Sequence, residues 1–85
     1  YVEVANNASK TAGDEVNFSY DFPSDFKYAP ISTATPINVG NTEAGRNVSV
    51  ILKTVTTSKI EGTVKFNTTG DVSVAVNLIV IGIPN

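Results

Sequence analysis

The sequence predicts an all-β fold, a six-stranded antiparallel β-sandwich formed by one domain that spans all 85 residues. Apolar and polar residues alternate along most of the chain, which is the period of a strand with one buried face. Runs rich in Gly, Pro, Asn, Asp and Thr separate these segments at the short spacings of all-β domains. The chain has no cysteine, so we expect packing and association to stabilise it.

The first two strands are expected near the N-terminus. The first covers about Tyr1–Ala5, and a polar connection follows over Asn6–Asp14. The second runs over Glu15–Phe22, and its apolar face is aromatic and expected to be buried. That face consists of Val16, Phe18, Tyr20 and Phe22. Pro23 ends this strand because proline has no amide hydrogen to donate. The more exposed Tyr28, on the following turn, is a candidate surface contact for a ligand.

Three further strands are expected before the last one. The third is Ile31–Thr35, and a longer connection covers Pro36–Arg46. The fourth begins at Val48 and ends near Thr56, and a tight reversal leads to the fifth strand, Lys59–Asn67. The fifth strand should direct Ile60, Val64 and Phe66 inward, with Gly62 at a bulge or a close contact.

The sixth strand, Val72–Ile83, is apolar on both faces. One face carries Val72, Val74, Val76, Leu78 and Val80, and the other carries Ile79, Ile81 and Ile83. A strand with two apolar faces must be buried by a packing layer on each side. A domain this small has few elements left to form the second layer. A partner chain is therefore expected on the isoleucine face, which makes Ile79, Ile81 and Ile83 the predicted interface of an oligomer.

The composition argues against several function classes. The chain has no His and no Cys, which removes the commonest general base, the thiolate nucleophile and most transition-metal ligands. Asp14 and Glu15 should point to opposite faces, and Asp21 and Asp25 should cap amides of a proline turn. We therefore expect no enzyme, no cofactor and no metal site.

Nucleic acid and membrane partners are not expected either. The formal net charge is −2, and Lys and Arg form no cluster that could follow a row of phosphates. No segment reaches the roughly 18 apolar residues that a membrane-spanning helix needs. Asn-x-Ser/Thr sequons begin at Asn7, Asn17, Asn47 and Asn67, as several would by chance in a chain rich in these residues.

Several segments, in their order and spacing, resemble the C-terminal heads of bacteriophage tail-fibre proteins that look like H-type lectins. The resemblance covers about residues 15–82. The matching segments are Val16-x-Phe18-x-Tyr20-x-Phe22, Ala29-Pro30-Ile31, Val48-x-Val50, Lys59–Phe66 and Val76–Gly82. The resemblance implies a parallel homotrimer on an extracellular virion, the C-terminal fragment of a longer protein whose shaft precedes Tyr1. It also implies attachment to a host-cell surface glycan or another receptor.

The lectins' sugar site itself has no counterpart here. The lectins use a histidine and an aromatic residue in the turn before the last strand, where this chain has Asn67–Asp71. Alternating connections instead predict that loops Asn6–Asp14, Pro36–Arg46 and Asn67–Asp71 meet at one end, with the N-terminus at the other. The predicted ligand-binding residues of this distal tip are Asn7, Asp14, Arg46, Asn67 and Asp71.

Two other functions fit the same residues. The trimer could be a purely structural virion or appendage module that binds no glycan, since the tip lacks His and Trp. The chain could also be a bacterial surface adhesin with an immunoglobulin-like sandwich, which shares the strand number but not the order of the segments.

Overall fold

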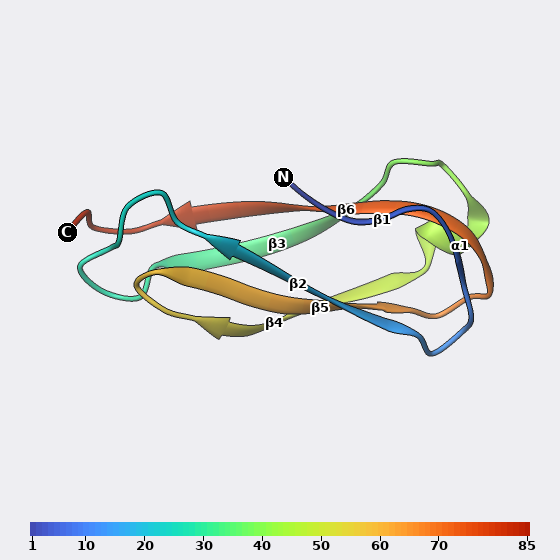
Figure 1. The fold of residues 1–85 in the computed structure, drawn as a ribbon, viewed down its shortest axis with the longest axis horizontal. Coiled ribbons are helices and arrows are strands. Elements are labelled where there is room, and N and C mark those ends of the chain that lie inside the picture. The colour runs from blue at the N-terminus through green and yellow to red at the C-terminus, as the bar shows by residue number, and fades with distance from the viewer.

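The computed structural model describes all 85 residues as two antiparallel sheets packed face to face, which confirms the all-β prediction (Figure 1). The strands are β1 (Val2–Lys10), β2 (Glu15–Asp21), β3 (Ile31–Asn38), β4 (Val48–Val55), β5 (Lys59–Phe66) and β6 (Gly70–Ile81), and a short helix, α1, covers Glu43–Arg46. One sheet has the order β1-β6-β3 and the other β2-β5-β4. Strand β1 faces β2 and β3 faces β4, so the sheets stack strand on strand.

The core lies between the two central strands. β5 contributes Ile60, Val64 and Phe66, each 0% exposed, as the sequence predicts. β6 contributes Val72, Val74 and Val76, which are also buried. Phe18 of β2, Ala44 of α1 and Ala75 of β6 are the other buried apolar residues. The core is therefore concentrated in the half of the sandwich that α1 closes.

Gly62 makes the close contact that its place in β5 predicts. It pairs with Phe18 of β2 on one side and with Leu52 of β4 on the other. A bulge in β4 at Lys53 lies beside this pair, because Leu52 pairs with Gly62 and Thr54 with Glu61. Both features expected of this glycine are present.

Strand β1 is longer than the alternation predicts, and the predicted connection over Asn6–Asp14 is wrong in its first half. The strand continues to Lys10 across two irregularities, one between Glu3 and Ala5 and one between Ala5 and Ala8. Each inserts an extra residue, so the alternation loses its phase and the polar pair Asn6-Asn7 lies within the strand. Asn7 has φ of 48°, a left-handed conformation that asparagine tolerates.

The connection predicted over Pro36–Arg46 contains structure at both ends. Strand β3 extends through Pro36 to Asn38, which an edge strand allows because its outer side needs no amide donor. Helix α1 was not expected from the sequence. Thr42 starts it, since its Oγ1 accepts a 3.0 Å hydrogen bond from the Gly45 amide.

Strand β1 covers only half of β6. The pairing begins at Val2 with Val76, whereas β3 pairs with β6 as far as Ile81. Tyr1 therefore lies near the middle of the 43 Å long axis, and the C-terminus occupies the end away from α1 (Figure 1). The sequence predicts the N-terminus at the end opposite the tip loops, whereas Tyr1 lies between the two ends of the sandwich (Figure 1).

Candidate functional site

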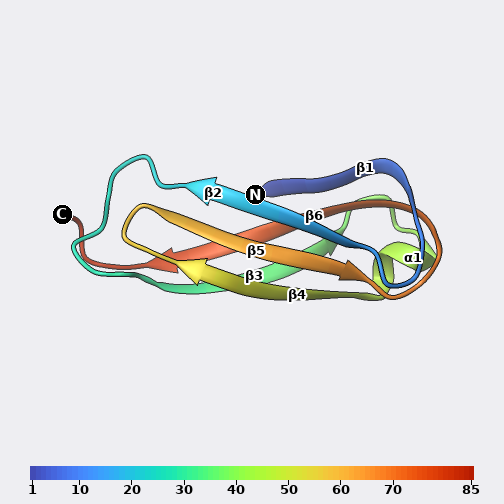
Figure 2. The same cartoon turned by 60° about the horizontal axis from the view of Figure 1, so that its bottom comes forward.

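The loops predicted to form a distal tip do lie at one end of the sandwich, together with α1 (Figure 2). The turn after β1 is fixed by Asp14, whose carboxylate accepts a 2.8 Å hydrogen bond from the Thr11 amide. Its main chain accepts from the Phe66 amide at 2.8 Å, which ties this turn to the end of β5. The backbone amide of Asn67 donates a 3.1 Å hydrogen bond to the backbone carbonyl of Asn47. These bonds connect the loops into one surface.

Four of the predicted ligand-binding residues also bond within the chain. Asn7 lies farther from the tip, in the β1 bulge. Its backbone amide donates a 2.9 Å hydrogen bond to Ser73 Oγ. Asn67 Nδ2 donates to Ser49 Oγ at 3.1 Å. Arg46 pairs with Glu43 at 2.8 Å, but both side chains are mostly exposed, so this ion pair is easily exchanged.

Asp71 is different from the other four. It is exposed at the start of β6, where it pairs with Ser9 of β1, and its carboxylate makes no hydrogen bond within the chain. Of the five predicted residues, the structure thus leaves Asp71 and the exposed Arg46 with charged groups to offer a ligand.

The outer face of the β1-β6-β3 sheet carries an uncovered group of isoleucines. Ile79 is 60% exposed and Ile81 is 67% exposed, and Ile83 just beyond the strand is 58% exposed. Ile31 of β3 pairs directly with Ile81 and is 75% exposed, which enlarges the patch. We call Ile31, Ile79, Ile81 and Ile83 the isoleucine face. The sequence predicts its β6 members, but not Ile31, which follows from the β3–β6 register.

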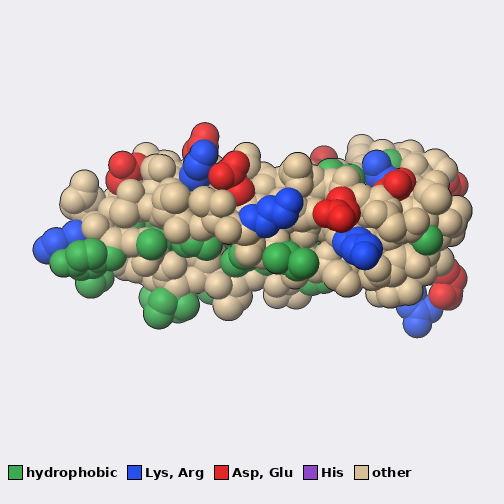
Figure 3. Space-filling model, turned by 90° about the horizontal axis from the view of Figure 1, so that it is seen from below, with side chains coloured by type: hydrophobic (Ala, Val, Ile, Leu, Met, Phe, Trp, Pro, Cys, Tyr) green, Lys and Arg blue, Asp and Glu red, His purple; other side chains and the backbone are tan.

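The charged side chains form no large patch of one sign. In Figure 3, basic and acidic groups are interspersed along the visible face, and hydrophobic side chains gather toward the end that holds the C-terminus. No group of three or more Asp or Glu residues is placed to hold a metal ion. The only helix has four residues, so it is far too short to cross a bilayer.

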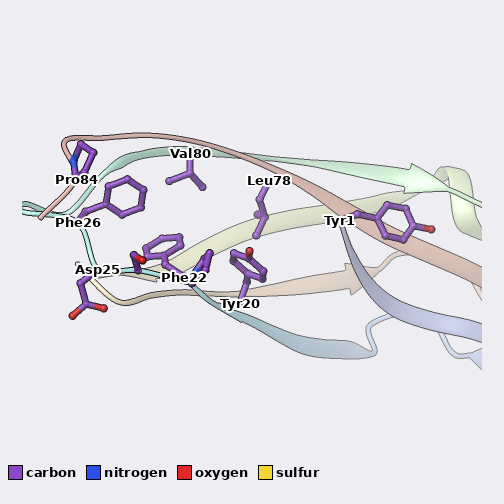
Figure 4. A pocket seen from close by; sticks show the side chains of 10 residues that line it. Tyr1, Tyr20, Phe22, Asp25, Phe26, Leu78, Val80 and Pro84 are labelled. Atoms are coloured by element: carbon purple, nitrogen blue, oxygen red, sulfur yellow. The ribbon is translucent and has the colours of Figure 1, made fainter.

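A second surface was not predicted from the sequence. Beyond the end of β1, the two sheets leave between them a cleft of about 470 Å³ (Figure 4). Its side chains come from β2, from the connection that follows β2, from β6 and from both chain ends, and most are apolar. They are Tyr1, Tyr20, Phe22, Pro23, Ser24, Asp25, Phe26, Leu78, Val80 and Pro84.

The floor and end wall of this cleft are aromatic. Tyr20 and Phe22 meet edge to face with 6.1 Å between ring centroids, and Phe22 meets Phe26 in the same way at 4.9 Å. Tyr20 is 41% exposed, so the prediction that the whole aromatic face of β2 is buried is wrong at this end. The face does point inward, but Tyr20 faces the cleft and not the core.

Backbone hydrogen bonds fix the loop that closes the cleft. The amide of Phe26 donates to the Thr57 carbonyl at 2.9 Å, and the Lys27 amide donates to the Ile83 carbonyl at 2.8 Å. The predicted role of Asp21 and Asp25 as caps is wrong, since neither carboxylate accepts a hydrogen bond from an amide, and Asp25 lines the cleft. These two bonds attach the loop to the turn after β4 and to the C-terminal segment.

Comparison with known proteins finds no family model, no curated protein and no solved structure that matches this chain.

Proposed function

We propose that this chain is the homotrimeric receptor-binding head of a phage tail fibre or tail-tip protein, with a fold like that of H-type lectins. In this proposal the isoleucine face packs around the trimer axis. The tip formed by α1 and its neighbouring loops attaches the virion to a host-cell surface glycan or another receptor. The upstream fibre shaft and the extracellular location follow from the same resemblance.

The exposed isoleucine face is the observation that supports the proposal most strongly. Ile79 and Ile81 carry large aliphatic side chains, more than half exposed, on a paired strand rather than on a loop. A contiguous apolar patch of this kind on a small domain marks an interaction surface. A second and third copy of the same chain supply a matching apolar surface without a further partner.

The position of the tip agrees with an attachment role. The isoleucine face lies toward the C-terminal end of the long axis, while the tip lies at the opposite end (Figure 2). Three copies packed in parallel would then present three identical tips in the same direction. Weak binding at each tip would combine into firm attachment, because the second and third contacts become intramolecular.

Light scattering on the purified chain tests the assembly. A mass near three times the 9.0 kDa chain mass is expected, and a single-chain mass would contradict the proposal. Binding is tested separately with a glycan array and with adsorption to host cells. Arg46→Ala and Asp71→Ala should reduce binding, and the matched control is Lys53→Ala, which lies in the β4 bulge away from the tip.

A second candidate function is a purely structural trimerisation module. The hydrogen bonds within the chain favour it, because the side chains of Asp14 and Asn67 already have partners in the tip. This candidate predicts a trimer with no glycan binding and with host adsorption unchanged by Arg46→Ala and Asp71→Ala.

A further inference from the structure

We propose that Asn77, with Thr35 beside it, fixes the direction and register in which copies of this chain pack on one another. The side-chain amide of Asn77 would hydrogen-bond to the same residue and to Thr35 of the neighbouring copies. This inference rests on the proposed trimer, and it adds the residues that make the packing parallel. The polar contact is incomplete in one chain, because each copy supplies only one amide to it.

Asn77 continues the isoleucine face along the outer side of β6. Directly paired residues of a sheet point to the same face, and so do alternate residues of one strand. The β3–β6 register therefore forms three rows of exposed pairs on this side, Ile31 with Ile81, Thr33 with Ile79 and Thr35 with Asn77. Asn77 lies about 7 Å from Ile79 along the strand, on the side toward the tip. A copy that covers Ile79 thus also reaches Asn77.

The three rows change from apolar to polar along β6. The first has two isoleucines, the second an isoleucine and a threonine, and the third an asparagine and a threonine. Copies that pack in parallel and in register bring equal rows together, so polar groups meet polar groups. Copies that pack in opposite directions around Ile79 would bring Asn77 of one against Ile81 of the other. The rows therefore favour the parallel arrangement, in which all tips point the same way.

Asn77 and Thr35 need hydrogen-bond partners when this surface is covered. Three other asparagines, Asn38, Asn47 and Asn67, donate side-chain hydrogen bonds within the chain. The side chains of Asn77 and Thr35 make none and are exposed, so only solvent satisfies them in a single chain. Burial without a partner costs free energy. Because an amide both donates and accepts, three Asn77 side chains around an axis can each donate to the next.

The amide of Asn77 also penalises the wrong registers. A shift of one copy by two residues along β6 would bury it against Ile79 of the neighbour, which has no polar group to bond. Isoleucines alone would tolerate the shift, because apolar packing is not directional. A single buried asparagine selects the register and number of helices in coiled coils in the same way, at a cost in stability. Asn77 thus determines which assembly forms rather than how tightly the copies bind.

Asn77→Val tests this role, because valine favours a strand and removes the amide. Light scattering gives the mass of the assembly. Spin labels on Glu43→Cys in α1 give the distance between the tips of neighbouring copies by double electron–electron resonance. Glu43 is suitable because its side chain is 88% exposed and the chain has no cysteine of its own. With Asn77 in place, we expect a mass of three chains and a single label distance below the 43 Å long axis.

Asn77→Val should change the single mass into a mixture and add a second label distance above 43 Å, from copies that run in opposite directions. Asn77→Gln keeps the amide and should retain the single mass and the single distance. The matched control is Asn6→Val, the same change at an exposed asparagine of β1, and it should alter neither reading.

The outcomes separate this inference from the proposed function. A trimer whose mass and label distance are unchanged in Asn77→Val would overturn the role of Asn77 and leave the proposed trimer intact. Complete dissociation of Asn77→Val would also overturn it, because the residue would then hold the copies together instead of selecting their arrangement. A single-chain mass with Asn77 in place would contradict the proposed function itself, and the inference with it.

Discussion

The ring of Phe18 occupies the space that a side chain on Gly62 would need. The two residues are directly paired across β2 and β5, and a Cβ atom on Gly62 would lie 2.5 Å from Phe18 Cζ. The same Cβ would lie 2.6 Å from the carbonyl oxygen of Ile51, which belongs to the backbone and cannot rotate away. The absence of a side chain at Gly62 is therefore what allows Phe18 to be buried.

Gly62→Ala should destabilise the fold by about 1–3 kcal/mol through overpacking. Urea unfolding followed by circular dichroism measures this difference. The double variant Gly62→Ala with Phe18→Leu should lose less than the sum of the two single variants, because the smaller side chain removes part of the clash. Additive losses would show that the contact between Phe18 and Gly62 is not the cause.

Ile79→Asp or Ile81→Asp should dissociate the proposed trimer, because it would bury three like charges near the axis without partners. Light scattering should show the mass falling from three chains to one. Ile51→Asp is the matched control, since Ile51 is also 60% exposed but lies on the outer face of the other sheet. An unchanged mass in the Ile79 and Ile81 variants would place the interface elsewhere.

Thr42→Ala should loosen the tip, because it removes the N-terminal cap of α1. The free energy of unfolding should fall by about 1 kcal/mol. Asn38 supports the same turn, since its Nδ2 donates a 3.0 Å hydrogen bond to the Thr42 carbonyl. That bond would remain in Thr42→Ala, but the first turn of α1 would have lost its cap. Faster amide exchange at Gly45 is the direct measurement. Thr42→Ser keeps the hydroxyl and should leave that exchange rate near the original value.

The alternation of apolar residues predicts much of this fold because it directly reflects which side of a strand is buried. It assigns the inward face of β5 correctly and separates Val80 from Ile79 on opposite faces of β6. It fails where an extra residue enters a strand, as at Asn7, because a bulge reverses the phase of the pattern.

The cleft could not be predicted from the sequence for a different reason. It lies next to the first residue pair of the β1–β6 ladder, Val2 with Val76. That register is set by contacts between segments more than 70 residues apart, and no local pattern encodes it. Helix α1 was missed because its four residues are too few to show a helical period.

Ser32→Ala should stabilise the chain by about 1 kcal/mol. The Ser32 hydroxyl is buried on β3 opposite Val80, and it has no hydrogen-bond partner. An unpaired buried hydroxyl costs free energy that its removal restores, and alanine leaves only a small void. Thermal unfolding of both proteins at equal concentration measures the difference. Ser49→Ala is the control and should lower stability slightly, because Ser49 Oγ accepts a 3.1 Å hydrogen bond from Asn67 Nδ2. Loss of stability in Ser32→Ala would mean that this hydroxyl has a partner in solution.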